Sequence, residues 1–222
     1  MRLILGLDPS LTVIGYCLLT QNKKISKIGQ YKVNKDISLT RKIISITDEI
    51  ISLAKKHKVT DLAIEAVYYN CNAKNLIEWS RLHGSLVRAW VKEMPDNPEP
   101  MFIMANVARP HSGIKGTAQK IEVQVKIGKD YNLISDSIFY SYCGKIGNQI
   151  QQYQNNIKEC KKTIKNKKEL KKAIKKIRGK HKYQMNKLSG EFEKETKGIS
   201  EHIVDSIVIA NAYLEITREG KN

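Results

Sequence analysis

The fold of this chain is decided by residues 2–33, RLILGLDPSLTVIGYCLLTQNKKISKIGQYKV, which hold three apolar segments separated by short polar turns. Residues 2–8 form a compact apolar run that Pro9 breaks, and residues 12–19 and 25–33 follow as further apolar segments. Short apolar runs bounded by turn residues are typical of strands. Three strands in succession with short connections predict an antiparallel meander.

Beyond residue 33 the chain alternates between helical and extended patterns. We expect helices over residues 38–57, 73–93, 118–130 and 199–217, and short buried strands over 62–64 and 101–104. Ser38 is a suitable N-cap for the first of these helices. The order βββαβαβα predicts an α/β domain in which helices flank a mixed five-stranded sheet.

The positive charge of the chain is concentrated in one segment. The 222 residues hold 39 Lys and Arg against 22 Asp and Glu, a net charge of +17. Residues 151–190 alone hold 14 basic and 2 acidic residues, a net charge of +12. Such an excess indicates a polyanionic partner, either nucleic acid or an anionic membrane surface. We therefore divide the chain into a globular domain of residues 1–145 and 198–222 and a basic helical insertion of residues 146–197.

The basic insertion carries a narrow apolar seam. Its side chains recur at heptad spacing in Ile150, Tyr153, Ile157, Cys160 and Ile164. We expect a helix over 148–178 that ends at Gly179, with lysines over most of its circumference. Such a helix is poorly suited to a core and well suited to lie along a DNA arm, although a coiled coil between two protomers would also use the seam.

The cysteines and the apolar segments of the chain indicate its cellular compartment. The four cysteines, Cys17, Cys71, Cys143 and Cys160, form no CxxC pair, which excludes a zinc ribbon and suggests no disulfide framework. No stretch approaches the roughly 20 apolar residues of a membrane span. The first apolar run is too short for a signal peptide. We expect a reduced, intracellular (cytoplasmic) protein with no membrane partner.

Four side chains predict a metal site. Asp8 and Glu65 end buried strands, where a carboxylate is costly unless it binds a partner. His202 and Asp205 lie at positions i and i+3 of the last helix and therefore share a face. Each acid alone has an ordinary explanation, a turn before Pro9 or a buried salt bridge. Converging carboxylates would repel unless they held divalent cations such as Mg²⁺ or Mn²⁺, and two such ions can hydrolyse a phosphodiester. Together with the basic charge, this predicts a nuclease.

Five segments in order resemble RuvC-type Holliday-junction resolvases. They are LILGLDPS with GY (3–10 and 15–16), LAIE (62–65), the helix of residues 72–84, the basic stretch of residues 107–120, and HIVDSI (202–207). The resemblance implies an RNase H-like fold, which agrees with the order βββαβαβα. The basic insertion departs from the family pattern.

By this resemblance the chain is a Mg²⁺-dependent endodeoxyribonuclease, with Mn²⁺ able to substitute, that resolves branched DNA as a homodimer by two-metal-ion hydrolysis. The metal ligands and catalytic residues would be Asp8, Glu65, His202 and Asp205, with Lys120 as a further catalytic residue. Arg109 and Lys120 would lie near the scissile phosphate. Tyr68, or its neighbour Tyr69, would help to open the junction, and His111 and Lys115 would contact phosphate.

Two questions stay open. Asp136-Ser137-Ile138 mimics Asp205-Ser206-Ile207, but we favour Asp205 because it has a histidine at i−3 and lies in a longer apolar helix. The alternative functions are an RNase H-fold nuclease acting on another nucleic acid and a non-catalytic junction-binding protein. An actin-like or sugar-kinase ATPase is disfavoured, because Pro9-Ser10 replaces the phosphate-loop glycines.

Apolar residues also recur along the helix of residues 73–93. They are Leu76, Trp79, Leu82, Leu86 and Trp90. Some must pack on the sheet, but two tryptophans on one helix leave surface for a partner. This face is the expected dimer contact.

Overall fold

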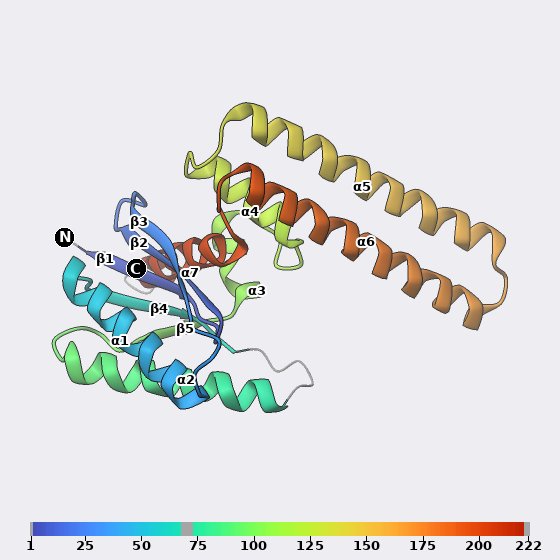
Figure 1. Ribbon diagram of the computed structural model, residues 1–222. Coiled ribbons are helices and arrows are strands. Elements are labelled where there is room, and N and C mark those ends of the chain that lie inside the picture. The colour runs from blue at the N-terminus through green and yellow to red at the C-terminus, as the bar shows by residue number, and fades with distance from the viewer. Residues whose placement is uncertain (1, 68–72, 220–222) are drawn as a thin grey trace. The chain divides into compact units, whose positions relative to one another are not determined.

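The computed structural model describes residues 2–67 and 73–219 and divides the chain into two compact units (Figure 1). The first unit comprises residues 1–117 and 202–222, and the second comprises residues 118–201. The second unit is larger than the insertion of residues 146–197 that we expected. The helix of residues 120–130 belongs to it because this helix shares a hydrophobic core with the two helices that follow.

The first unit contains a mixed five-stranded sheet, as the sequence predicts. Its strands are β1 (Leu3–Asp8), β2 (Val13–Thr20), β3 (Ile25–Lys32), β4 (Asp61–Glu65) and β5 (Met101–Ile103). Their order in the sheet is β3-β2-β1-β4-β5. The meander β1–β3 is antiparallel, whereas β4 runs parallel to β1 and β5 runs parallel to β4. The carboxyl ends of β1, β4 and β5 therefore lie at one edge of the sheet.

The two faces of the sheet are covered by different helices (Figure 1). Leu3, Leu5 and Leu7 of β1 belong to the core that packs against α1 (Leu39–His57) and α2 (Ala73–Glu93). The alternate residues of β1 face α7 (Glu201–Glu219) on the opposite side. Ser38 caps α1 as expected, since its side chain accepts a hydrogen bond from the Arg41 backbone N–H.

Two glycines let α7 approach the sheet backbone closely. A Cβ atom on Gly6 would lie 2.2 Å from the carbonyl oxygen of Ser206, and one on Gly15 would lie 1.9 Å from the carbonyl oxygen of His202. Real Cβ atoms do not tolerate such distances, so only glycine permits this packing. The approach holds the first turn of α7, at His202, against β2 and the following turns, at Ser206 and Ala210, against β1.

A buried ionic group anchors the other end of α7. Asp61 is 3% exposed and accepts two hydrogen bonds from Arg2, at 2.7 and 3.0 Å, and one from the Tyr213 hydroxyl at 2.7 Å. Burial alone would raise the pKa of Asp61, but its hydrogen bonds from Arg2, Thr60 and Tyr213 hold the pKa below its usual value. This group ties the start of β1, the start of β4 and α7 together.

The connection from β5 leaves the sheet through a short helix α3 (Ala105–Ala108) and a 3₁₀ turn η1 (Pro110–Ser112). Gly113 follows with a positive φ of 67°, a conformation that glycine adopts without strain. This segment contains Arg109 and His111, two of the residues for which the family resemblance implies DNA binding.

The second unit is helical, and Figure 1 shows α5 turning back into α6 as a hairpin. Its helices are α4 (Lys120–Asp130), α5 (Asp136–Thr163) and α6 (Lys167–Glu195). Near α4 they enclose an apolar core that includes Tyr142 and Phe192, whose rings meet edge to face at 5.1 Å. The long amphipathic seams of α5 and α6 therefore cover each other within one chain.

The predicted helix of residues 148–178 is wrong in its boundaries. The chain breaks at residues 164–166, and Gly179 lies inside α6. Asn166 starts α6, because its side chain accepts hydrogen bonds from the backbone N–H groups of Lys168 and Glu169. The heptad spacing shifts at the same place, between Ile164 and Leu170. A strong N-cap thus sets the boundary, and an exposed glycine is tolerated within the helix.

No helix in the described part of the chain is both long enough and apolar enough to cross a membrane.

Candidate metal centre

Two carboxylates meet where β1 and β4 end. The parallel register pairs Leu7 with Ile64, so Asp8 and Glu65 follow side by side. Leu7 and Ile64 both point into the core beneath α1 and α2, and the alternation of a strand then turns the next residue of each strand to the α7 face. The register of one strand pair therefore places both acids on the same side of the sheet.

Helix α7 supplies a third carboxylate. One oxygen each of Asp8, Glu65 and Asp205 lies within 4.8 Å of the others, and all three residues are half-buried. Asp205 reaches the cluster because its helix lies on Gly6 and Gly15. These three residues are called the acid triad below.

His202 joins the acid triad through Asp8. Its Nδ1 donates a hydrogen bond of 2.5 Å to the Asp8 carboxylate. His202 and Asp205 are both in the first two turns of α7, so they approach the triad from the same face. The contact places the imidazole beside a candidate ligand and orients that carboxylate; its expected role as a metal ligand stays a prediction.

The electrostatics of the triad favour a bound cation. Burial raises the pKa of Glu65 to about 9, and the charges of Asp8 and Asp205 add to the effect. Arg109 opposes it with its positive charge. One member of the triad is therefore protonated at neutral pH unless a cation neutralises the cluster. Oxygen donors in this number and arrangement fit a divalent cation, so the donor chemistry of the triad makes it a candidate metal site.

Arg109 lies at the same cluster. Its guanidinium forms an ion pair with Asp205 at 3.8 Å, and both side chains are largely buried. A hydrogen bond from Arg109 to the Gly116 carbonyl, at 3.4 Å, joins the two ends of the loop. The structure thus places one cation directly against the acid triad.

Asn211 is a residue that the sequence reasoning missed. It is 4% exposed and donates hydrogen bonds of 3.0 Å to the His111 carbonyl and the Ser112 hydroxyl. These bonds fix the loop that follows Arg109 to α7. The signal was present in the sequence, since Asn211 is a single amide inside the apolar run of residues 207–214.

The other basic residues of the predicted site are placed differently. Lys120 is the first residue of α4 in the second unit, where it forms an ion pair with Glu201. His111 is half-buried in the 3₁₀ turn. Lys115 is exposed in the loop. Tyr68 and Tyr69 lie outside the described residues.

The geometry separates the two rival acids. Asp205 belongs to the triad, whereas Asp136 is an exposed residue at the start of α5 that forms an ion pair with Lys129. Asp205, which lies in the longer apolar helix, is therefore the acid that joins the cluster.

The apolar face of α2 is mostly used within the chain. Leu82, Leu86 and Trp90 are buried in the core of the first unit, so they are not surface for a partner. Leu76 and Trp79 are half-buried. The exposed apolar side chains of this helix are instead Ile77 and Val91, at 53% and 46% exposure. The three buried residues agree with the expectation that part of this face packs on the sheet, and the dimer contact itself stays a prediction.

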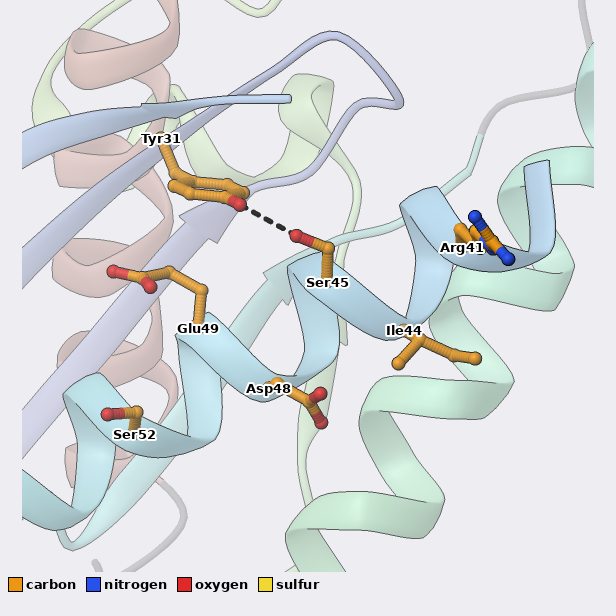
Figure 2. A pocket seen from close by; sticks show the side chains of 7 residues that line it. All are labelled: Tyr31, Arg41, Ile44, Ser45, Asp48, Glu49 and Ser52. Atoms are coloured by element: carbon orange, nitrogen blue, oxygen red, sulfur yellow. Dashed lines mark hydrogen bonds between the residues drawn. The ribbon is translucent and has the colours of Figure 1, made fainter. Parts of the chain in front are cut away.

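A hollow of about 530 Å³ lies over α1 on the other face of the sheet (Figure 2). Tyr31 of β3 shares a hydrogen bond of 2.7 Å with Ser45 there. Figure 2 shows the lining side chains of Arg41, Ser45, Asp48 and Ser52 spread along α1. Within the described residues, the acid triad is the one cluster of His, Cys, Asp and Glu that fits a metal ion.

Sequence comparison identifies similar proteins. The model of a family described as "Crossover junction endodeoxyribonuclease RuvC" matches residues 4–137. A protein of that name from Fusobacterium nucleatum is 30% identical over 89 residues, which cover 39% of this chain and 47% of that protein. The one from Aliarcobacter butzleri is 27% identical over 126 residues, covering 55% of this chain and 80% of that protein. The match thus spans about half the length of the first relative. The family match ends one residue after Asp136, so Asp205 lies beyond it.

Structure comparison supports the fold. Thermus thermophilus RuvC, solved in complex with a Holliday junction substrate, superposes with a TM-score of 0.60 at 10% sequence identity. The alignment covers 99% of this chain and 97% of that protein. At this level of identity the likeness concerns the fold alone, and it confirms the RNase H-like α/β architecture.

Proposed function

This chain belongs to the RuvC family, and we propose that it is a structure-selective endonuclease that resolves four-way DNA junctions. The observation that carries the proposal is the acid triad of Asp8, Glu65 and Asp205 at the carboxyl ends of β1 and β4. A carboxylate cluster of this kind fits phosphodiester hydrolysis, and the net charge of +17 fits a polyanionic substrate.

The cofactor that we propose is Mg²⁺, with Mn²⁺ as a substitute, because small hard cations prefer carboxylate oxygens. Two such ions bound at the triad would supply an activated water and stabilise the leaving 3′ oxygen. Asp8, Glu65 and Asp205 would hold the ions. His202 would keep the Asp8 carboxylate in position through its hydrogen bond or bind metal itself.

Two cations of the chain are proposed to act on the phosphate. Arg109 lies against Asp205 at 3.8 Å, so a phosphate that approaches the triad would meet its guanidinium. Lys120 would also contact the scissile phosphate, which requires its ammonium to exchange Glu201 for a phosphate oxygen. His111, Lys115 and one of Tyr68 and Tyr69 complete the proposed DNA-binding set.

We propose that the enzyme acts as a homodimer. A four-way junction has two-fold symmetry, and a two-fold dimer places two active sites on opposite strands for paired cuts. The exposed residues Ile77 and Val91 of α2 offer apolar surface for the contact. Light scattering should give about twice the chain mass of 25.3 kDa. A monomer that still makes paired cuts would contradict the dimer.

The function is tested by incubation with an end-labelled four-way junction and with linear duplex of the same sequence, each with Mg²⁺ and with EDTA. We expect Mg²⁺-dependent paired nicks in the junction alone. Junction binding without cleavage under either condition would instead indicate a non-catalytic binding protein. Preferential cleavage of an RNA–DNA hybrid included in the panel would indicate a different nuclease of the same fold.

A further inference from the structure

The net positive charge of the second unit comes from one half of its helical hairpin. Residues 158–182, called the tip segment below, run from the end of α5 through the turn into the first half of α6. They contain 13 Lys and Arg residues and 2 Asp and Glu residues. The rest of the unit, residues 118–157 and 183–201, contains seven of each kind. The tip segment therefore has a net charge of +11, whereas the rest of the unit has a net charge of zero.

The cations of the tip segment face solvent. All 13 are exposed, and none of them forms an ion pair within the part of the chain that the structure describes. The apolar residues of the segment are turned inward, because Ile164, Leu170, Ile174 and Ile177 are half-buried along the seam between the helices. The cations thus cover the solvent-facing surface of the two helices, on the sides away from the apolar seam.

This arrangement destabilises the free hairpin. Lys168 and Lys172, Lys171 and Lys175, and Lys172 and Lys176 are like-charge neighbours at i and i+4. Such pairs cost a few tenths of a kcal/mol each. Repulsion of this kind is relieved when an anion binds, so the tip segment is preorganised to gain from a polyanion.

We propose that the tip segment is a second DNA-binding surface, which contacts the phosphate backbone of a duplex without reading its sequence. The part of α6 from 167 to 182 spans about 24 Å at 1.5 Å per residue. A duplex of that length presents about 14 phosphates, and nine of the 13 cations of the segment lie on that part of α6. Twelve of these are lysines, compact point charges that suit phosphate rather than base edges. The inference rests on the proposed DNA substrate.

The composition of the tip segment disfavours the other polyanionic partners. A membrane-surface helix keeps aromatic or leucine side chains exposed opposite its charges, whereas no large apolar residue of the described tip segment is exposed. Protein interfaces are depleted in lysine and anchored by aromatic residues, and the segment contains no Phe, Trp or Tyr.

The test measures duplex binding as a function of KCl concentration, without Mg²⁺ and without cleavage. The variant replaces Lys161, Lys165, Lys168 and Lys172 by Gln. Its control replaces Lys24, Lys32, Lys35 and Lys56, four exposed lysines of the first unit, and changes the net charge equally. We expect the log–log salt slope of the tip variant to flatten by about 0.9 per lost contact, up to about 3.6, with affinity at least about tenfold weaker. The control should keep the wild-type slope.

A third variant separates charge from folding. Lys→Arg at the same four tip positions keeps the charge and should retain the slope. Equal slopes for the tip variant and its control would overturn the proposal, as would loss of phosphatidylserine-vesicle binding with unchanged DNA binding. Because the assay needs no cleavage, a slope change with an uncut junction would contradict the proposed nuclease and leave the tip surface supported.

Discussion

The two units of this protein treat charge in opposite ways. In the first unit acids are drawn inward: Asp61 is buried beneath Arg2 and Tyr213, and the acid triad is half-buried at the sheet edge. In the second unit the cations of residues 158–182 stay in water without ionic partners among the described residues. The buried acids of the first unit need fixed partners that offset the cost of removing a charge from water. The lysines of the second unit need only a helix that keeps their charged ends in solvent.

This difference separates chemistry from affinity. A metal centre requires donor atoms at fixed distances, which a sheet register and a closely packed helix provide. Attraction to a phosphate backbone depends mainly on the number of cations and on salt. We therefore expect changes in the first unit to act on catalysis and folding, and changes in the hairpin to act on binding.

The largest effect should follow removal of one triad charge. Asp8→Asn or Asp205→Asn should lower junction cleavage by about 1000-fold or more, because a preorganised charge at the reacting phosphate is lost. Binding should persist or tighten, since repulsion of phosphate decreases. Gel-based cleavage and binding assays measure both. Asp136→Asn is the matched control and should cleave normally. Loss of cleavage in Asp136→Asn, with cleavage retained in Asp205→Asn, would refute the assignment of Asp205.

A methyl group at Gly15 should break the closest packing of the first unit. The added Cβ would collide with the His202 carbonyl and displace the turn of α7 that carries His202 and Asp205. Gly15→Ala should therefore lower the free energy of unfolding by about 3 kcal/mol or more, as measured by urea denaturation. Gly84→Ala, at an exposed helical position with open space, should change it by less than about 1 kcal/mol. Equal effects would mean that the close contact does not constrain α7.

The metal-free triad should make stability depend on pH. Glu65 has a pKa of about 9 in the folded protein against 4.5 for the ordinary group. The folded state therefore keeps a proton that the unfolded state releases, and this contribution to stability decreases as pH rises from about 4.5 to 9. The slope is at most about 1.4 kcal/mol per pH unit.

Urea denaturation in EDTA between about pH 5 and 8 measures this slope. Glu65→Gln should flatten it and should be more stable than the wild type at the upper end. Mg²⁺ should stabilise the wild type but not the variant. A pH slope that is identical in both proteins would show that Glu65 does not carry the effect.

The smallest expected effect lies in the hairpin. Gly179 is exposed within α6 with no atom near the position of a Cβ. Gly179→Ala should stabilise the helix by about 0.5–1 kcal/mol, because alanine loses less backbone entropy on folding. Hydrogen exchange of α6 amides should slow accordingly, while amides of β1 should not change. Faster exchange in α6 would show that the glycine fills a structural need.

Much of the fold follows from local patterns. The three apolar runs of residues 2–33 predict the meander, and the helical spacing behind Ser38 predicts α1. These features depend on neighbours in sequence, so periodicity and capping are sufficient to find them. The hairpin turn was missed because both arms keep a heptad spacing. The local signal for the turn was Asn166, whose side chain caps α6, whereas Gly179 was interpreted as the helix end.

The sequence by itself determined the order of elements, the acids at the strand ends and the concentration of charge in residues 151–190. Tertiary structure alone decided which side each acid faces, the contact of His202 with Asp8 across 194 residues, and the anchoring of the loop by Asn211. It also decided that Leu82, Leu86 and Trp90 belong to the core. The physical reason is that strand register and backbone approach at Gly6 and Gly15 depend on segments far apart in the chain, which no local pattern records.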